Sequence, residues 1–319
     1  MNAETFAEWL HRQGHKVYRT ESSYWYDAGP HVLQAFPYHW LITPDKDELH
    51  TLMMKNWIIA LRYSAPPDYH EGKISYHIVQ QNCYNLQMLK KQARNGVKCG
   101  LRKFNIEKIT FDRLALEGWT LMEETLARQN RSQSMDRLEW ERLCRAAENL
   151  PGFQVFAATC NDELAGAVIV CRIDDFYTVP YAMSRCHFLR DHVNNALFYS
   201  VSCDLLNREN IKGIFFTVQS LDAPEDVDNF KLRMGFESRI VRQNVVFHPC
   251  LKPFITPVVY SLSRKLLKHY PSNPQIAKSE GMLRFHLEGR LPVKEQVWPD
   301  HLKAQIDLLE ENAATGGLR

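Results

Sequence analysis

Hydrophobic and polar positions follow an ordered series in the second half of the chain. Two apolar runs, 164–173 and 176–183, are separated by Asp174 and Asp175, and this spacing predicts a β-hairpin with a tight acidic turn. Apolar residues at steps of three and four then predict a helix over 193–210. These residues are Val193, Leu197, Val201, Leu205 and Leu206. The pattern therefore places two neighbouring strands before an amphipathic helix.

Strand and helix signals continue after this helix. A buried strand is predicted at 214–218, and the acidic segment Pro224-Glu225-Asp226 predicts the start of another helix. Gly235 is positioned to end that helix, because glycine readily adopts the left-handed conformation that follows a last helical turn. A final strand is predicted at 238–247. The order of strand, strand, helix, strand, helix and strand is typical of an acyltransferase core.

This region resembles the GNAT acyltransferase superfamily, and specifically its Fem-like branch, which is built from two such domains in one chain. Three stretches carry the resemblance: Glu163-Leu164-Ala165-Gly166-Ala167-Val168, Asn194-Asn195-Ala196-Leu197-Phe198-Tyr199 and Phe230-Lys231-Leu232-Arg233-Met234-Gly235-Phe236. The resemblance covers about residues 84–247. The resemblance implies an α/β (α+β) fold class with two GNAT-like domains, each a mixed, mostly antiparallel sheet flanked by helices, the first domain being degenerate.

The length of 319 residues fits about two domains. We predict an N-terminal degenerate GNAT-like domain at 1–150, a C-terminal GNAT-like acyltransferase domain at 151–249, and a helical extension with a disordered tail at 250–319. Pro151-Gly152 interrupts the chain before a predicted strand and favours a boundary near Leu150.

Charge and cysteine usage bear on the binding partners and the cellular compartment of the protein. Lys plus Arg number 39 and Asp plus Glu number 37, so the net charge of +2 gives no global argument for nucleic acid or membrane. The eight cysteines contain no C-x-x-C pair, which favours a reduced, cytoplasmic protein. The polar start is no signal peptide, and no apolar run approaches the length of a membrane span, so we predict no integral membrane segment.

The resemblance also implies where a donor binds. In GNAT-like proteins the strand before the central helix splays from its neighbour, and its backbone pairs with the arm of an acyl-CoA or related thioester. Here that strand would be 179–184, with Tyr181 and Met183. Backbone N–H groups at the start of the next helix would hold a pyrophosphate. The donor-binding candidates there are Arg190, Asn194, Asn195 and Ala196.

The donor loop departs from the usual superfamily pattern. Acetyl-CoA users carry a glycine-rich R/Q-x-x-G-x-G/A loop, whereas the stretch from Arg190 to Ala196 has no glycine. Asp191 adds a negative charge beside the expected pyrophosphate. This departure puts ordinary CoA binding in doubt and favours the Fem-like branch, whose members include enzymes that use aminoacyl-tRNA.

Lys231 is the first catalytic candidate. Superfamily members often carry a Tyr at this position that protonates the leaving thiolate, and Fem-like proteins carry Lys. The resemblance therefore implies that Lys231 stabilises the oxyanion or a donor phosphate. The alternative is a surface Lys that pairs with Asp228 or Glu225. Tyr199 is a second candidate, either as a proton donor or as a half-buried structural residue.

A basic stretch precedes the region that carries most of the resemblance. Six positive charges without an acid lie between Lys90 and Lys103, in a predicted helix at 86–95 that ends at Gly96 and a predicted strand at 97–104. They predict either a solvated face or an anion site. The residues chosen for the anion site are Arg94, Arg102 and Arg128, the last from a predicted long helix at 111–129.

Aromatic residues near the N-terminus suggest an acceptor pocket. Trp25, Tyr38 and His39 could line it, and the alternative is that such side chains only fill the core. Near the other end, a basic amphipathic helix is predicted at 257–270, where packing against the second domain is favoured over a membrane-surface role.

Three functions stay open at this point. The first is an acyltransferase that moves an acyl group from a thioester to a small-molecule or cell-envelope amine by direct transfer, with an acyl-carrier protein as a further donor. The second is an aminoacyl transferase that uses charged tRNA. The third is a non-catalytic module that binds an anionic polymer. His11 and His15 have H-x-x-x-H spacing, but Gly14 should end the helix between them and no Glu follows His11, so no metal is predicted.

Overall fold

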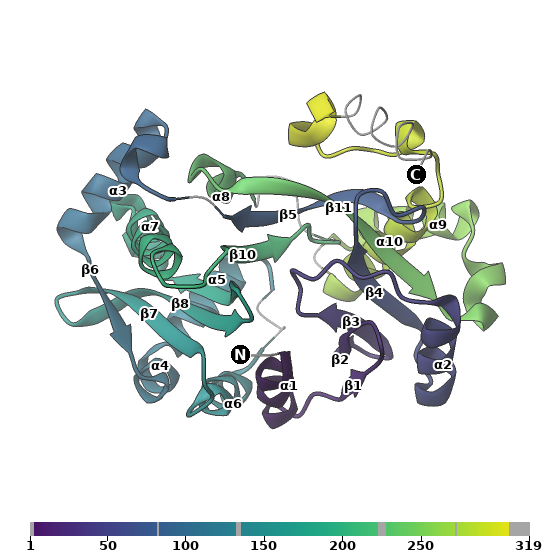
Figure 1. Cartoon of the computed structure of the whole chain (residues 1–319), viewed down its shortest axis with the longest axis horizontal. Coiled ribbons are helices and arrows are strands. Elements are labelled where there is room, and N and C mark those ends of the chain that lie inside the picture. The colour runs from purple at the N-terminus through teal and green to yellow at the C-terminus, as the bar shows by residue number, and fades with distance from the viewer. Residues whose placement is uncertain (1–2, 82, 132–134, 223–227, 272, 306–319) are drawn as a thin grey trace. The chain divides into compact units, whose positions relative to one another are not determined.

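The computed structural model describes residues 3–81, 83–131, 135–222, 228–271 and 273–305 (Figure 1). The chain divides into two compact units, each assembled from separate stretches. Unit 1 contains residues 1–16, 78–217 and 228–237, and unit 2 contains residues 17–77, 218–227 and 238–319. Both units combine stretches that are distant in the sequence, whereas the predicted domains 1–150, 151–249 and 250–319 are continuous segments. These predicted boundaries stay a prediction.

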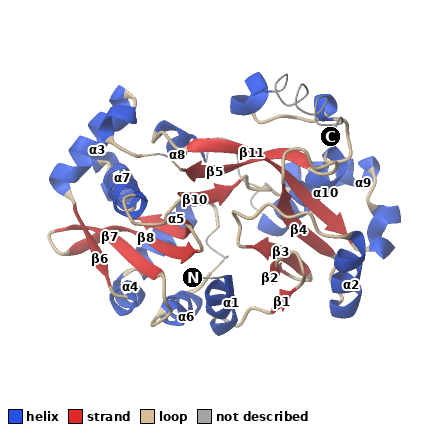
Figure 2. Cartoon of the chain, viewed as in Figure 1, coloured by secondary structure: helices blue, strands red, loops and turns tan. Residues whose placement is uncertain are grey.

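Unit 1 is built on a mixed sheet in the order β10-β9-β8-β7-β6 (Figure 2). Its strands are β6 (Asn105–Ile109), β7 (Phe153–Cys160), β8 (Glu163–Ile173), β9 (Phe176–Ser184) and β10 (Gly213–Val218). Neighbours from β6 to β9 pair antiparallel, and β9 pairs parallel with β10. The predicted hairpin is β8–β9, and Asp174 forms its turn with a left-handed φ of 54°.

Helices cover this sheet. They are α1 (Ala3–Arg12), α3 (Lys91–Lys103), α4 (Phe111–Glu117), α5 (Trp119–Arg128), α6 (Arg137–Ala147), α7 (Val193–Leu206) and α8 (Asn229–Arg233), with a short 3₁₀ turn at Cys186–Asp191. The predicted central helix is α7, which packs against β7 and β8 through Val193 and Leu197. The predicted start of the next helix, Pro224-Glu225-Asp226, lies outside the described residues.

The prediction of a helix and then a strand between 86 and 104 is wrong. Residues Lys91–Lys103 form one helix, α3, and both of its glycines lie against the first turn of α7. A Cβ on Gly96 would lie 3.0 Å from His192 Nδ1, and one on Gly100 would lie 2.6 Å from the His192 carbonyl oxygen. These glycines permit close contact between two helices rather than ending one. The predicted long helix at 111–129 is similarly divided into α4 and α5 at Gly118.

The strands of unit 2 follow the order β1-β2-β3-β4-β11-β5. Its strands are β1 (Val17–Arg19), β2 (Tyr24–Gly29), β3 (Val32–Phe36), β4 (Ala60–Ala65), β11 (Glu237–Phe247) and β5 (Lys73–Gln80), the last of which continues into unit 1 after residue 77. β1 to β3 and the β4–β11 pair are antiparallel, whereas β3 and β4 are parallel. The core of this unit includes Trp25, Leu33, Leu61 and Tyr63.

The helices of unit 2 are α2 (Lys46–Asn56), α9 (Pro257–His269) and α10 (Pro274–Glu288), with 3₁₀ turns at Pro249–Phe254, Val293–Glu295 and Asp300–Gln305. Phe285 of α10 is buried in a cluster with Val245 and Phe247 of β11. The stretch after 250 therefore contributes to a core through α10. The tail predicted to be disordered lies outside the described residues.

Gly235 terminates α8 as predicted. Its φ of 79° is left-handed, the Gly235 N–H donates to the Leu232 carbonyl at 3.0 Å, and the Phe236 N–H donates to the Lys231 carbonyl at 3.2 Å. This pair of bonds is the Schellman arrangement of a helix end. Phe236 then stacks on Phe216, with ring centroids 4.1 Å apart, which holds the end of α8 against β10.

We predict that Gly235→Ala lowers the free energy of unfolding by about 1–2 kcal/mol, the cost of left-handed backbone for a residue with a Cβ. Space is not the cause, because the nearest atom to a Cβ there is a Leu89 methyl at 3.5 Å. Urea denaturation measures the change. Gly29→Ala is the matched control, since a Cβ at Gly29 meets nothing within 4 Å and the residue has no left-handed φ. Equal effects at both positions would contradict the prediction.

Candidate functional site

The candidate site starts where β9 parts from β10. Their parallel ladder joins Phe176 to Gly213, Tyr177 to Ile214, and Thr178 to Phe215, and it ends there. β9 then continues along β8 alone in the register given for that pair, with Tyr181 opposite Ile169 and Met183 opposite Ala167. Beyond Thr178, the edge of β9 that faces β10 is no longer paired in this ladder.

A β-bulge lies at the point of separation. Thr178 is opposite Cys171 and Tyr181 is opposite Ile169, so two residues of β9, Val179 and Pro180, face one residue of β8. A bulge bends its strand and locally increases the twist. Pro180 also lacks a backbone N–H to donate to a ladder. Pro180, Tyr181 and Ala182 are half-buried, whereas their neighbours Val179 and Met183 are buried.

The end of β9 is fixed by α5. The Ser184 N–H donates to Thr125 Oγ1 at 3.0 Å, and the Thr125 hydroxyl donates to the Ser184 carbonyl at 3.3 Å. Arg128, one turn further along α5, donates through Nη1 to the same carbonyl at 3.4 Å. Of the three arginines chosen for an anion site, Arg128 is therefore the one placed at the end of the candidate donor strand. Thr125 and Ser184 were not selected from the sequence, because their pairing is visible only in three dimensions.

The start of α7 follows directly. His192 lies at the helix N-terminus with a left-handed φ of 63°, and its side chain makes no capping hydrogen bond. Asp191, the acid that disfavours a pyrophosphate here, pairs with Lys103 of α3 at 2.6 Å. This hydrogen bond raises the pKa of Lys103. The loop therefore carries a neutralised carboxylate, and Arg190 beside it is exposed.

The other predicted donor-binding residues lie in the first turn of α7. Asn194 is half-buried, Asn195 donates through Nδ2 to Met234 Sδ at 3.2 Å, and Ala196 is fully buried against Gly100 of α3. The sequence thus brings Met183, the residues from Arg190 to Ala196, and Arg128 into one region of unit 1. Ala196 contributes packing there, and its side chain has no exposed surface.

Lys231 lies on α8, and its Nζ donates to Asp228 Oδ1 at 2.7 Å. The lysine side chain is 20% exposed and that of Asp228 is 9% exposed. The alternative partnership with Asp228 is therefore present, while Glu225 lies outside the described residues. The lysine side chain keeps some exposed surface, and a negative group that approaches α8 can reach it.

Tyr199 lies one turn after Asn195 on α7, with its ring centroid 5.6 Å from that of Tyr84. Burial and, to a smaller extent, a hydrogen bond with Cys203 raise the pKa of Tyr199 to about 12. The phenol is therefore protonated at neutral pH. The Tyr84 hydroxyl donates to the Met234 carbonyl at 2.5 Å, which connects this aromatic pair to the end of α8.

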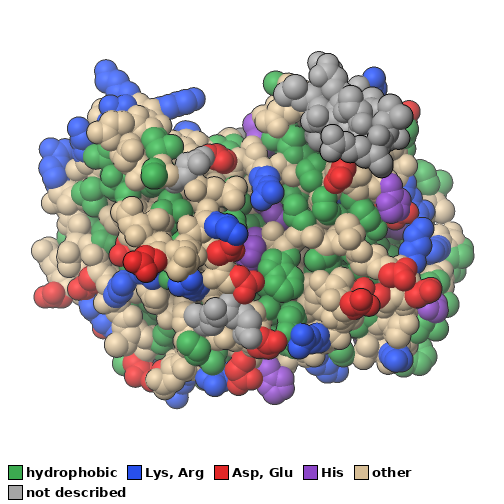
Figure 3. Space-filling view, in the orientation of Figure 1, with side chains coloured by type: hydrophobic (Ala, Val, Ile, Leu, Met, Phe, Trp, Pro, Cys, Tyr) green, Lys and Arg blue, Asp and Glu red, His purple; other side chains and the backbone are tan. Residues whose placement is uncertain are grey.

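The basic stretch becomes one face of α3. Arg94 turns inward and donates to the Leu89 carbonyl at 2.9 Å, whereas Arg102 and Lys98 are exposed. Figure 3 shows blue side chains gathered over α3. A shallow groove on this helix is lined by Gln92, Asn95, Gly96, Lys98, Cys99, Leu101, Arg102 and His192. Arg102 and the N-terminal residue of α7 thus share one groove.

The predicted acceptor residues belong to unit 2. Trp25 is completely buried, and its Nε1 donates to Thr20 Oγ1 at 2.8 Å, so this side chain fills the core, as the alternative held. Tyr38 and His39 are half-buried, and the Tyr38 hydroxyl donates to that of Tyr26 at 3.0 Å. Trp25 therefore has no surface to offer a ligand, while Tyr38 and His39 have some.

A polar network in unit 2 was missed by sequence reasoning. Arg62 of β4 donates to Gln243 Oε1 at 2.7 Å and to the Gln219 carbonyl at 2.8 Å, and Gln243 donates to Ser75 Oγ at 2.9 Å. Burial lowers the pKa of Arg62 to about 10. The signal was a polar residue in each of several apolar strands, but nothing in the sequence showed that these strands are neighbours.

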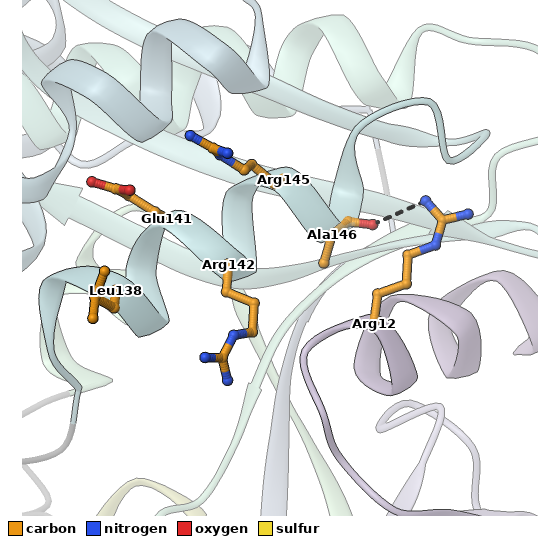
Figure 4. A pocket seen from close by; sticks show the side chains of 6 residues that line it. All are labelled: Arg12, Leu138, Glu141, Arg142, Arg145 and Ala146. Atoms are coloured by element: carbon orange, nitrogen blue, oxygen red, sulfur yellow. Dashed lines mark hydrogen bonds between the residues drawn. The ribbon is translucent and has the colours of Figure 1, made fainter.

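A second depression lies between α1 and α6 of unit 1. It is lined by Arg12, Leu138, Glu141, Arg142, Arg145 and Ala146. Figure 4 shows Arg12 reaching from α1 to the backbone oxygen of Ala146 on α6. None of the predicted site residues lines it, and the hydrogen bond from Arg12 ties two helices together.

Two further findings concern the described part of the chain. It contains no group of three or more His, Cys, Asp and Glu side chains arranged to hold a metal ion. In the same residues, no helix combines the length and the apolar character needed to cross a bilayer.

Comparisons with known proteins find similar folds but no similar sequence. No protein-family model and no curated protein matches the sequence. Solved structures similar to this chain include the C-terminal DUF2156 domain of a protein assigned as a lysylphosphatidylglycerol synthetase in Agrobacterium fabrum. It is 11% identical, with a TM-score of 0.51, and the match covers 76% of this chain and 87% of that domain.

FemX is similar to the same degree. Its TM-score is 0.51 at 10% identity, and the match covers 78% of this chain and 92% of FemX. A conserved protein of unknown function from Bacteroides thetaiotaomicron matches with a TM-score of 0.50 at 12% identity, over 75% of this chain and 87% of that protein. The chain has a GNAT/Fem-like fold.

In GNAT/Fem-like terms, β8, β9, α7, β10 and α8 are the elements expected from the resemblance. The predicted splay between the strand before the central helix and its neighbour corresponds to the end of the β9–β10 ladder at Thr178. The roles of Lys231, Tyr199 and the donor-loop residues stay predictions. The fold class is confirmed, including the mixed, mostly antiparallel sheets flanked by helices.

The two α3 glycines give a matched test of the α3–α7 contact. Gly100→Ala should lower the free energy of unfolding by about 1–3 kcal/mol, because the new methyl overlaps the His192 carbonyl and overpacking has this cost. Gly96→Ala faces movable side-chain atoms at 3.0–3.1 Å, and it gains the same helix propensity of about 1 kcal/mol. It should therefore be nearly neutral. Urea denaturation of both variants measures the difference, and equal losses would show that the contact with α7 is not what selects glycine.

Proposed function

We propose that the protein is an acyltransferase that moves an acyl group from a thioester donor directly to an amine. The observation that carries this proposal is the separation of β9 from β10 after Thr178, with the bulge at Val179 and Pro180. This is the feature that lets a GNAT-like sheet accept an extended donor arm. GNAT/Fem-like structural neighbours support the same class of reaction.

In the proposed reaction the donor arm lies along β9 beyond the bulge. The amine nitrogen attacks the thioester carbonyl carbon, a C–N bond forms, and the C–S bond breaks. The leaving thiolate takes a proton, and the ammonium that forms loses one. A phenol that remains protonated at neutral pH suits the first of these transfers, which is the role proposed for Tyr199. Lys231 would stabilise the negative charge that develops on the carbonyl oxygen.

The donor's anionic groups would meet the start of α7. Its first backbone N–H groups favour an anion, as at other helix N-termini. Lys103 offsets the charge of Asp191, and Arg102 lines the adjoining groove. Basic side chains of α3 would thus supply part of what a glycine-rich loop supplies through its backbone. Acyl-CoA, or a related thioester on an acyl-carrier protein, is the proposed co-substrate. The proposed acceptor is a small-molecule or cell-envelope amine, and the proposed location is the cytoplasm.

A second candidate is an aminoacyl transferase that uses charged tRNA. The observation in its favour is the basic surface of α3, where Lys91, Lys98 and Arg102 are exposed and the helix contains no acid. Similarity in fold to FemX is consistent with it. A polyanion would release counterions from such a surface, so its affinity would fall steeply with salt.

Donor binding separates these candidates. The purified protein is mixed with acetyl-CoA, longer acyl-CoAs, or total tRNA, and thermal unfolding is followed. We expect stabilisation by acyl-CoA, because a ligand that binds only the folded state raises the melting temperature. Stabilisation by tRNA alone, lost at high salt, would favour the aminoacyl transferase. Stabilisation by neither compound, together with no thiol release from any thioester, would leave acyl transfer without support.

Lys231→Ala is expected to lower turnover by at least roughly tenfold, the effect of losing one transition-state contact. Thiol release from the preferred donor measures turnover, and the melting temperature should change little. Lys212→Ala is the control, since Lys212 is an exposed lysine that also pairs with an acid, Asp175.

Asp228→Asn separates a catalytic role from a structural one. If Lys231 served only its ion pair with Asp228, both variants would lose stability to a similar extent and neither would lose turnover in proportion. Unchanged turnover in Lys231→Ala would remove this residue from the site.

A further inference from the structure

Helix α9 has three distinct faces. It begins after Thr256, whose Oγ1 accepts the Val259 N–H at 3.3 Å, and it runs from Pro257 to His269. At 3.6 residues per turn, Tyr260, Ser263 and Leu267 share one side. These residues are half-buried, and Tyr260 packs against the cluster that contains Phe285 and Val245. This face attaches the helix to unit 2.

The second face is apolar and exposed. Val258, Leu262 and Leu266 follow one another at intervals of four residues, and they are 69%, 54% and 51% exposed. Val259 and Tyr270 widen the same stripe, and Phe254 in the preceding turn is also exposed. The sequence analysis favoured packing of this helix against the second domain, and for these side chains that expectation is wrong. Soluble proteins seldom leave a contiguous apolar stripe of this kind without a function.

The third face is basic. Lys265 and Lys268 lie along one flank of the apolar stripe, on the side opposite Ser263, and Arg264 lies further round the helix, next to Tyr260. Among the described residues none of these three forms an ion pair, and Arg264 lies over the Tyr260 ring at 5.8 Å. The sequence from 249 to 279 contains no Asp or Glu. The acids nearest to α9 in the structure, Glu280 and Glu288, belong to α10 and act on Tyr260 on the attached side of the helix.

We propose that α9 binds an anionic lipid surface, lying in the plane of the membrane interface. An exposed apolar stripe bordered by Lys and Arg is the pattern of helices that insert their apolar face among lipid headgroups. The lysine stems can extend along the apolar stripe while their ammonium groups reach the phosphates. The absence of acids from α9 itself and from the segments that flank it distinguishes this helix from a protein-binding stripe with mixed charge. The proposal does not depend on the acyl-transfer proposal, because α9 contributes no residue to the β9–α7 region.

Vesicle co-sedimentation of the full chain tests the proposal. Vesicles of phosphatidylcholine alone are compared with vesicles that also contain phosphatidylglycerol. We expect binding to increase at least about tenfold on the anionic vesicles, because both the apolar and the electrostatic contributions then act. Added salt should reduce that increase, since it screens exposed charges.

Matched variants locate the surface. Leu262→Gln with Leu266→Gln should lower vesicle binding at least about fivefold, since the buried apolar area falls. Leu116→Gln with Leu138→Gln removes two leucines that are 71% and 70% exposed elsewhere, and it should leave binding unchanged. Lys265→Gln with Lys268→Gln should abolish the preference for anionic lipid, whereas Lys46→Gln with Lys55→Gln should retain it. Melting temperatures confirm that the variants fold.

Three results would overturn the proposal. The first is no sedimentation with anionic vesicles. The second is an equal loss in the α9 leucine pair and in the control pair. The third is a concentration-dependent dimer that the α9 leucine variants abolish, which would show that the stripe binds a second copy of the chain.

Discussion

The structure of unit 1 depends on the point at which β9 stops pairing with β10 and continues to pair with β8 alone. Its first residues are held between β8 and β10, and after Thr178 the ladder to β10 ends while the ladder to β8 continues. The bulge at Val179 and Pro180 makes this change possible without breaking the β8–β9 pair. Ser184 is then fixed by Thr125, so the departing end of β9 is anchored at a defined place. A strand that is held at both ends but released on one side can bind an extended ligand without unfolding.

The start of α7 is controlled by a second constraint, the close approach of α3. Gly96 and Gly100 allow the two helices to meet at His192 and Ala196. This contact brings the basic face of α3 next to the α7 N-terminus and places Lys103 on Asp191. A substitution on α3 would therefore act on the anion-binding end of α7 through backbone position as well as through charge.

Local signals in the sequence predicted the β8–β9 hairpin, α7 and the cap at Gly235, because turn chemistry and periodicity determine them within a few residues. The same approach failed for α3, because the sequence alone does not distinguish a glycine that ends a helix from one that lets a neighbouring helix approach. The partner of the second kind, His192, is far away in sequence. The only sign of the β-bulge in the sequence is Pro180 within the strand. The network around Arg62 left only single polar residues in separate apolar strands, and these could not be connected because the order of the strands in the sheet cannot be read from the sequence.

Helix α9 illustrates the limit of periodicity from another direction. Apolar residues at intervals of four show that a helix has an apolar face, but they do not say whether the protein or something else covers it. The face that attaches α9 contains Tyr260 and Leu267, and the helical spacing therefore places Leu262 and Leu266 on the outward face. Burying both faces would require protein on two sides of one helix. The chain instead places lysines beside the outer face, and this combination is suited to a charged interface rather than to a protein core.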